Sequence, residues 1–398
     1  MDKIGELLTR GVEKIYPTKE ELEKVLRSGK KLKLYYGIDP TGKLHIGHMV
    51  VLKKVRQFQD LGHEIIILIG DFTATIGDPT GKKATRQSLS REQVLQNAKD
   101  YNMHIGKILD LKKSNIRFLH NEEWTNKLKP IDLLEIASHF TVARLLERDM
   151  FQERIREGKE IYLHEFLYPI FQAYDSVTMD VDMEIGGNDQ TFNMLAGRDL
   201  MYRMKKKNKF VMATPLLTDA QGIKIGKTEG NSIALAEKPE DLFAKIMALP
   251  DDVILKGFEY LTDIPMSEIE RINETLSSGE NPVTRKKRLA FEIVKQLNTS
   301  EAAKKAQENF EKTVQQGEKP SGIPTFKWIS ANASGPSISH ALFDTGLVGT
   351  ISEGKRVTTQ GGTAVNDQIV TDPTVSYIPH EGDILRVGKR KFVKIKLN

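Results

Sequence analysis

The chain has 398 residues, of which 39% are hydrophobic and 28% charged, and its net charge is +5. This composition is typical of a globular protein of about two to four domains and excludes collagen-like or fully disordered chains. There is no cysteine, which excludes disulfides, thiolate catalysis and cysteine-ligated metals. We expect a cytoplasmic protein without a signal peptide, since residues 1–6 have no apolar core. We also expect no membrane span, since no apolar run approaches ~18 residues.

The positive charge is concentrated in the last fifth of the chain. Residues 319–398 contain ten Lys or Arg and six Asp or Glu, which accounts for +4 of the total. A basic module of this kind favours a polyanion partner, with RNA as the leading candidate. An ordinary solvated surface is the alternative.

The first part of the chain alternates between predicted strands and helices. The patterns predict a polar helical segment over 1–30, a strand over 31–36, a helix over 48–61, a strand over 64–70, a helix over 91–109 and a strand over 116–119. The Ile-rich strand over 64–70 is apolar on both faces, as in parallel sheets covered by helices. Residues 71–88 form a long loop, and such loops are usually functional or disordered.

The alternation is then interrupted by helices, and it resumes before a helical region. We predict helices over 130–156 and 164–179, a strand over 183–185, a helix over 191–204, a strand over 210–217, helices over 239–316, and a C-terminal part with strands such as 384–387 and 392–395. The predicted fold class is α/β: a Rossmann-like parallel sheet with a helical insertion, then an all-α domain, then a small α+β domain. The expected boundaries are 1–218 with the insertion at about 121–182, 219–316, a linker over 317–336, and 337–398.

Residues 35–48, here called the nucleotide loop, lie between a buried strand and a helix. Backbone N–H groups and the positive end of the helix dipole make such a helix start an anion site. Thr41, His45 and His48 add hydroxyl and imidazole donors, and the two histidines lie one helical turn apart. A helix cap with two partly exposed histidines is the alternative interpretation.

Residues 218–231, here called the lysine loop, follow the last predicted strand of the sheet. The segment contains Lys224-Ile225-Gly226-Lys227-Thr228, with further glycines at 222 and 230. Two mobile lysines three residues apart can reach a polyphosphate from one side. A hairpin with solvated lysines is the alternative.

A third pattern places polar side chains on one face of a predicted helix. Tyr168, Gln172 and Asp175 stand at i, i+4 and i+7, which indicates either a binding pocket or a hydrated groove. The segment 186–190, Gly-Gly-Asn-Asp-Gln, follows a strand, and ligands of open α/β sheets bind at strand ends.

Together these segments resemble one family along nearly the whole chain. His45-Ile46-Gly47-His48 resembles the HIGH element, and residues 224–228 resemble the KMSKS loop, of class I aminoacyl-tRNA synthetases. The helix over 168–175, the G-G-x-D-Q strand end and residues 76–83 resemble tyrosyl-tRNA synthetases, and residues 336–372 resemble the S4 RNA-binding domain of the bacterial ones. The chain departs from the pattern by Ile-Gly for Met-Ser and Thr228 for Ser in the lysine loop, and by Thr191 where many relatives have Trp.

The resemblance implies tyrosine activation by ATP to tyrosyl-adenylate, with release of pyrophosphate, followed by transfer to the 3′ end of tRNA(Tyr). It implies that Asp175 accepts the phenolic hydroxyl of tyrosine, which Tyr35 also contacts, and that Asp78 receives the ammonium. The implied tyrosine-binding residues are Tyr35, Asp78, Tyr168, Gln172, Asp175 and Gln190. The implied ATP-binding residues are Asp39, Gly47, Gly187, Asp189 and Lys227. The implied catalytic residues are Thr41, His45, His48, Lys82, Arg86, Lys224, Lys227 and Thr228, and the implied RNA contacts are Lys355 and Arg356.

The resemblance also implies partners and rivals. We expect ATP with Mg²⁺, L-tyrosine and tRNA(Tyr) as ligands, a homodimer, no membrane association and no protein-bound metal, since the sequence has no metal-ligand cluster. Tryptophanyl synthetases share the fold and both nucleotide motifs, but the 168–175 helix and the C-terminal module argue against them. A non-catalytic RNA-binding protein is expected to lose motif residues. A plain nucleotidyltransferase does not need the S4-like module.

Overall fold

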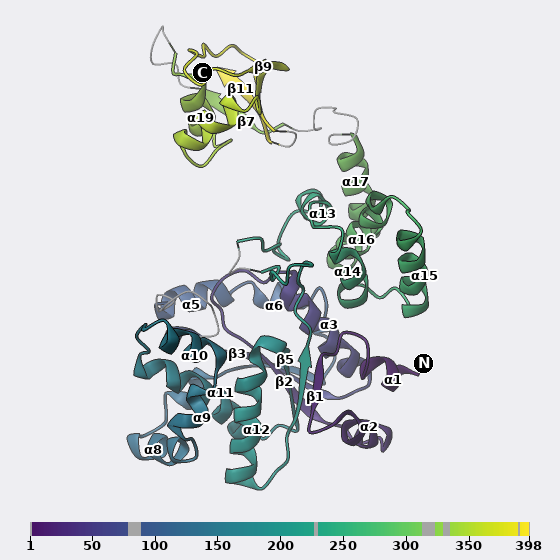
Figure 1. Cartoon of the computed structure of the whole chain (residues 1–398), viewed down its shortest axis with the longest axis vertical. Helices are drawn as coiled ribbons and strands as arrows, with labels where there is room; N and C mark the ends of the chain where they lie inside the picture. The colour runs from purple at the N-terminus through teal and green to yellow at the C-terminus, as the bar shows by residue number, and fades with distance from the viewer. Residues whose placement is uncertain are drawn as a thin grey trace. The chain divides into compact units, whose positions relative to one another are not determined.

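The computed structural model describes residues 2–78, 89–226, 230–312, 323–328, 335–388 and 391–397. The chain divides into two compact units, Met1–Ser300 and Glu301–Asn398, which are described separately. Figure 1 labels their elements along the chain. Within the described ranges, no helix combines the length and the apolar character that crossing a membrane requires.

The first unit is built on a six-stranded sheet. Its strands are β1 (Lys14–Tyr16), β2 (Lys33–Ile38), β3 (Glu64–Ile69), β4 (Ile116–His120), β5 (Met183–Gly187) and β6 (Phe210–Thr214), in the order β1-β6-β5-β2-β3-β4. β6, β5, β2, β3 and β4 are parallel, and β1 pairs antiparallel with β6 at one edge. The predicted parallel sheet is therefore confirmed. Strand β1 was missed, because a three-residue edge strand has too little pattern to stand out in a polar segment.

Helices cover both faces of this sheet. The helices of the sheet domain are α1 (Lys3–Leu7), α2 (Lys19–Arg27), α3 (Ile46–Asp60), α4 (Thr73–Ile76), α5 (Arg91–Ala98), α6 (Tyr101–Ile105), α7 (Glu122–Thr125), α8 (Pro130–Ser138), α9 (Val142–Leu146), α10 (Asp149–Arg156), α11 (Leu163–Met179), the short 3₁₀ turn η1 (Asn188–Gln190) and α12 (Thr191–Lys205). The predicted single helices over 91–109 and 130–156 are wrong in detail, because turns divide them into two and three helices.

In the strand order, β2 is followed in the chain by β3 on one side, and β5 is followed by β6 on the other side. Connections between parallel strands are right-handed, so α3, between β2 and β3, and α12, between β5 and β6, cover opposite faces. The strand order therefore reverses between the neighbouring strands β2 and β5. Ligands of open α/β sheets bind at the carboxyl ends of the strands at such a switch point.

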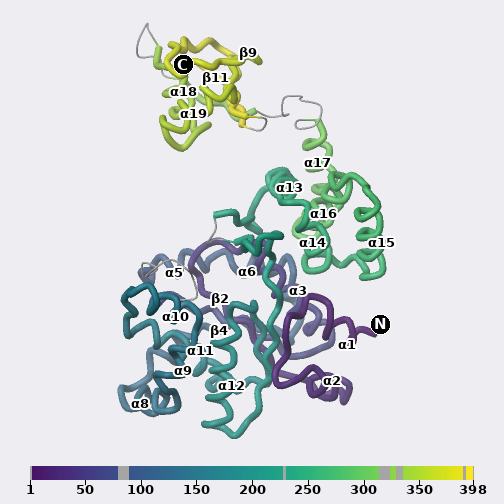
Figure 2. Tube along the Cα trace, in the orientation of Figure 1, coloured from purple at the N-terminus to yellow at the C-terminus, as the bar shows by residue number. Residues whose placement is uncertain are grey.

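The helical insertion gathers beside the β4 edge of the sheet, as the trace in Figure 2 shows. Its core joins α8, α9 and α11 to the sheet through Ile136, Leu145, Ile170, Ile66 and Tyr35, all buried. The predicted insertion is therefore packed on the sheet and fixes α11 next to the switch point.

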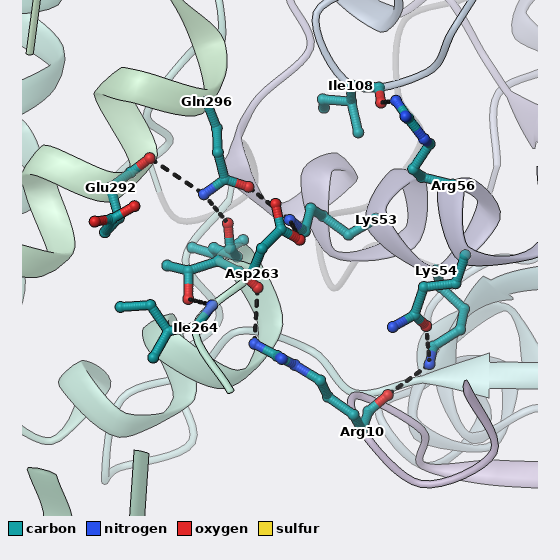
Figure 3. A network of polar contacts seen from close by, with 12 residues as sticks. Arg10, Lys53, Lys54, Arg56, Ile108, Asp263, Ile264, Glu292 and Gln296 are labelled. Atoms are coloured by element: carbon teal, nitrogen blue, oxygen red, sulfur yellow. Dashed lines mark hydrogen bonds and ion pairs between the residues drawn. The ribbon is translucent and has the colours of Figure 1, made fainter. Parts of the chain in front are cut away.

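A helical domain completes the first unit. Its helices are α13 (Pro239–Met247), α14 (Val253–Leu261), α15 (Met266–Ser277) and α16 (Pro282–Leu297). Figure 3 shows its polar junction with α3 and the N-terminal segment. The Lys53 ammonium of α3 pairs with Asp263 and donates to Gln296 Oε1 at 2.6 Å. The Arg10 guanidinium donates to the carbonyls of Phe258, Glu259 and Thr262 at the C-terminal end of α14, which is where a cation stabilises a helix.

The second unit contains a five-stranded sheet and short helices. Its elements are β7 (Thr325–Trp328), α18 (Ile338–Asp344), α19 (Ile351–Thr359), β8 (Thr363–Val365), β9 (Gln368–Val370), β10 (Ile384–Val387) and β11 (Lys391–Leu397), in the strand order β7-β11-β10-β8-β9, and α17 (Ser300–Phe310) begins at the boundary. Strand β7 lies inside the segment expected to be a linker, and it pairs parallel with β11. The predicted small α+β domain is confirmed.

Candidate active site

A cavity of about 650 Å³ opens at the switch point between β2 and β5. Its wall contains fourteen of the residues that the sequence analysis singled out. They are Tyr35, Asp39, Thr41, His45, Gly47, His48, Asp78, Tyr168, Gln172, Asp175, Gly187, Asp189, Gln190 and Lys224. Lys82, Arg86, Lys227 and Thr228 lie outside the described residues. Lys355 and Arg356 are exposed on α19 in the second unit.

The two histidines of the nucleotide loop form the cap of α3. His45 is the N-cap residue, and its Nδ1 accepts the Gly47 N–H at 3.1 Å. His48 Nδ1 accepts the N–H of His45, also at 3.1 Å. Because a neutral imidazole that accepts at Nδ1 carries its proton on Nε2, both rings present an N–H donor at Nε2. This is the donor set that an anion at a helix N-terminus needs.

The nucleotide loop is joined to the segment that directly follows the lysine loop, although about 190 residues separate them. The Ile46 N–H donates to the Ile233 carbonyl at 3.0 Å, and the Leu235 N–H donates to the Leu44 carbonyl at 2.8 Å. Lys224 Nζ reaches Asp189 Oδ2 at 2.6 Å, beyond the end of β5. Two anion-binding features, the α3 N-terminus and Lys224, therefore lie at one end of the cavity, next to Asp189 beyond the end of β5.

The other end of the cavity is lined by the predicted face of α11. Asp175 is only 2% exposed. Its two oxygens accept from Trp124 Nε1 at 2.8 Å and from Asn121 Nδ2 at 3.2 Å. Burial raises the pKa of Asp175, while the two donors lower it. Asn121 and Trp124 were not predicted from the sequence, because they follow β4 and reach α11 only in three dimensions.

A second carboxylate, Asp39, holds Tyr168, the first of the three polar residues on the α11 face. Asp39 accepts from the Tyr168 hydroxyl at 2.8 Å and from Thr73 Oγ1 at 2.7 Å. Burial and the nearby Asp39 raise the pKa of Tyr168 well above its ordinary value, so the phenol stays protonated and donates. Asp39 was predicted to bind ATP, and its position connects the nucleotide end to the α11 face.

Asp78 and Gln190 meet at the mouth of the α11 end. Gln190 Nε2 donates to Asp78 Oδ2 at 2.6 Å, and Asn193 Nδ2 donates to Gln190 Oε1 at 2.9 Å. Arg148, the N-cap residue of α10, approaches Asp78 Oδ1 at 3.5 Å. The chain of amides orients one carboxylate toward the cavity, where a ligand ammonium fits by charge.

A buried network below the α11 face is a further missed feature. Gln172 Nε2 donates to Glu184 Oε1 at 3.0 Å, and Glu184 is ion-paired with Lys209. The Tyr35 hydroxyl lies 3.0 Å from Ser176 Oγ. A glutamate inside the apolar strand β5 was a visible signal, but Lys209 stands in a lysine-rich turn without any local pattern.

Metal binding by the protein itself has no support in the described ranges. They contain no group of three or more His, Cys, Asp or Glu side chains able to hold a metal ion. The hydroxyl, imidazole N–H and ammonium groups at the nucleotide end are hydrogen-bond donors that suit a phosphate.

This fold and this cavity define a class I tRNA synthetase. The family model for tRNA synthetases class I (W and Y) matches residues 27–315, and the chain belongs to this family. Within it, the chain groups with bacterial tyrosine–tRNA ligases. It is 44% identical to that of Carboxydothermus hydrogenoformans, over 98% of this chain and 97% of the relative. It is 43% identical to that of Aquifex aeolicus, over 94% of each. The fold also matches tyrosyl-tRNA synthetase from Archaeoglobus fulgidus complexed with L-tyrosine, with a TM-score of 0.59 and 23% identity, over 77% of this chain and 98% of that one.

Proposed function

We propose that the chain activates L-tyrosine with ATP and then transfers it to tRNA(Tyr). In the first step a tyrosine carboxylate oxygen attacks the α-phosphorus, the bond to the bridging oxygen breaks, and pyrophosphate leaves. In the second step a hydroxyl at the tRNA 3′ end attacks the carbonyl of the adenylate, and AMP leaves. The observation that carries this proposal is one cavity with anion donors at one end and a buried, doubly hydrogen-bonded carboxylate, Asp175, at the other.

At the tyrosine end, Asp175 accepts the substrate hydroxyl and Asp78 receives the ammonium. Trp124 and Asn121 occupy one position on each Asp175 oxygen, which supports an acceptor held in place for a third donor. Tyr168, Gln172 and Gln190 complete the contacts to tyrosine. They line the same end of the cavity, and each is fixed by a carboxylate: Asp39, Glu184 and Asp78 respectively.

At the ATP end, positioning and charge stabilisation replace any protein nucleophile. His48 and Asp189 hold the ribose, with Asp39, Gly47 and Gly187 along the nucleotide. Thr41, His45 and Lys224 act on the phosphates together with Lys82, Arg86, Lys227 and Thr228, and Mg²⁺ arrives with ATP. The Lys224–Asp189 pair supports a two-position lysine, which exchanges this carboxylate for phosphate when ATP binds.

The second unit binds tRNA through Lys355 and Arg356, two exposed cations on α19. This unit, Glu301–Asn398, contains the S4-like domain over 337–398 and the linker over 317–336. The lysine loop and helical domain over 219–316 and the catalytic domain over 1–218 come before the linker. The protein acts as a cytoplasmic homodimer through the insertion. Ile131, Leu134 and Val142 on α8 and α9 are each about two-thirds exposed, namely 66%, 67% and 68%, which supports a covering partner.

Pyrophosphate exchange into ATP, measured with each of the twenty amino acids, tests this function. Tyrosine is expected to support exchange far above all others. Preferential exchange with tryptophan would reassign the substrate. The absence of exchange with every amino acid, from folded protein, would favour a non-catalytic RNA-binding role.

A further inference from the structure

The buried pair between Glu184 and Lys209 lies directly below the proposed tyrosine pocket. Lys209 is 0% and Glu184 2% exposed. Removing two charges from water is costly, and apolar residues of similar volume commonly replace such pairs without loss of stability. The pair is therefore poorly explained by stability alone.

The surrounding helix is shaped around the Lys209 ammonium. Gly197 of α12 faces it, and a Cβ at that position would lie 2.6 Å from Lys209 Nζ and 2.9 Å from Ser176 Oγ. Such distances are too short for a side chain. The glycine thus leaves space for a charged group between α12 and the pocket.

The two oxygens of Glu184 have separate partners. Oε2 faces Lys209, and Oε1 accepts the amide N–H of Gln172 at 3.0 Å. Because a carboxylate only accepts, it fixes the rotation of the Gln172 amide, whose NH₂ turns toward Glu184. Gln172 Oε1 is then the group left over. It is buried without a hydrogen-bond partner within the described residues, on a side chain that lines the cavity.

The other partner of the pair reaches Tyr35 through a serine. Lys209 Nζ donates to Ser176 Oγ at 2.8 Å, and an ammonium only donates. The Ser176 proton has two acceptors within reach, Tyr35 Oη at 3.0 Å and Glu184 Oε2 at 3.5 Å. The shorter contact directs it to Tyr35. Glu184 is also within hydrogen-bonding reach of the Tyr35 hydroxyl, but its two oxygens already accept from Lys209 and Gln172, so the Tyr35 proton is directed to a ligand in the cavity.

We propose that Glu184, Lys209 and Ser176 are positioning residues that set the hydrogen-bond polarity of the tyrosine pocket. Through Ser176, Lys209 makes the Tyr35 hydroxyl a donor to the phenolic oxygen of the substrate, which in turn donates to Asp175. Through Gln172, Glu184 presents an acceptor to the amino acid. Each group then donates to the next, from the Lys209 ammonium through Ser176, Tyr35 and the substrate hydroxyl to the Asp175 carboxylate. Phenylalanine lacks the hydroxyl and therefore interrupts this series of hydrogen bonds. This inference rests on the proposed tyrosine activation.

A double-mutant cycle of Ser176→Ala and Tyr35→Phe tests the serine link. Ser176→Ala should lower the ratio of kcat/KM for tyrosine to that for phenylalanine by about 3- to 10-fold, the range for one neutral hydrogen bond. In a protein that already carries Tyr35→Phe, adding Ser176→Ala should change the tyrosine-to-phenylalanine ratio less than about 2-fold, because no Tyr35 hydroxyl is left to orient. Additive effects, or equal losses for both amino acids, would overturn the link.

A matched control separates this effect from the loss of any buried serine. Ser339 is also fully buried, and its hydroxyl donates to the Pro373 carbonyl at 2.9 Å in the second unit. Ser339→Ala should leave the tyrosine-to-phenylalanine ratio in pyrophosphate exchange at the wild-type value. A similar fall of the ratio in this variant would also count against the link.

The ion pair is tested by the double variant Glu184→Leu/Lys209→Met, which keeps volume and leaves no unpaired buried charge. With an unchanged melting temperature, the tyrosine-to-phenylalanine ratio should fall about 3- to 10-fold. The KM should rise for both amino acids but not for ATP, because Gln172 loses its orientation. An unchanged ratio in the folded variant would reject the inference. Absence of tyrosine-dependent exchange in the wild-type protein would instead reject the proposed function.

Discussion

Replacing Asp175 by alanine should remove most of the preference for tyrosine over phenylalanine. The side chain is 2% exposed, and the donors Trp124 and Asn121 each occupy one oxygen. A tyrosine hydroxyl adds one charge-assisted hydrogen bond, which contributes about 1.5–3 kcal/mol. Phenylalanine leaves the buried carboxylate one donor short, which costs about 1–3 kcal/mol. The two effects together correspond to a factor of about 10² to 10⁴ in the ratio of kcat/KM.

Asp175→Asn should produce a smaller loss, about 10- to 100-fold, because a neutral hydrogen bond of about 0.5–1.5 kcal/mol remains. It should also change the pH profile. Burial raises the pKa of Asp175, so in the wild type the carboxylate gains its proton, and tyrosine binding weakens, at a higher pH than for an ordinary Asp. This acidic limb of kcat/KM for tyrosine should disappear in Asp175→Asn.

The assay is pyrophosphate exchange with both amino acids, accompanied by a melting curve for each variant. Asp71→Asn is the matched control. Asp71 is equally buried at 2% and accepts three hydrogen bonds, from Phe72, Glu122 and His120, but it does not line the cavity. Asp71→Asn should leave the tyrosine-to-phenylalanine ratio unchanged. An unchanged ratio in Asp175→Ala would refute the reasoning and show that the hydroxyl is recognised elsewhere.

Three further predictions concern other parts of the chain. Lys224→Met should lower the rate of pyrophosphate exchange about 10²- to 10³-fold, as for the loss of one preorganised donor, while the tyrosine Kd from equilibrium dialysis stays constant; a matching rise in Kd would contradict the phosphate role. Truncation before Gly317 should preserve exchange and remove most tRNA charging, with weaker salt dependence of tRNA binding; undiminished charging would exclude the second unit from tRNA recognition. Burial lowers the pKa of Lys54 to about 7, so the folded state binds fewer protons than the unfolded state between about pH 7 and its unfolded value of 10.5. In this pH range the free energy of unfolding should therefore rise with pH, by at most about 1.4 kcal/mol per pH unit. Urea unfolding of Lys54→Met should show no such rise. The same rise in Lys54→Met would show that other groups cause it.

Patterns that are local in the sequence predicted most of the candidate site. The histidines of the nucleotide loop are one turn apart, and Tyr168, Gln172 and Asp175 share one helix face, so their proximity follows from helix geometry. The parallel sheet followed from strands apolar on both faces, and the structure confirms it.

The rest of the site depends on contacts between distant segments. Asn121 reaches Asp175 across 54 residues and Lys209 reaches Glu184 across 25. No local periodicity encodes such pairs, because they arise only when the insertion and β6 pack beside α11 and β5. Strand β7 was missed for the same reason, since its four residues are a strand only through pairing with β11.

The junction in Figure 3 makes helix α3 a direct connection between the helical domain and the nucleotide loop. Its first turn is tied to the segment after the lysine loop, and Lys53, seven residues on, is tied to Asp263 and Gln296 of the helical domain. At 1.5 Å per residue, about 10 Å of continuous helix separates the two attachments. A helix of this length is stiff, so we expect a rigid-body shift of α14 and α16 to be transmitted along α3 to the two histidines at its N-terminus. A displacement of the helical domain would thereby change the position of the α3 N-terminus, where ATP is proposed to bind.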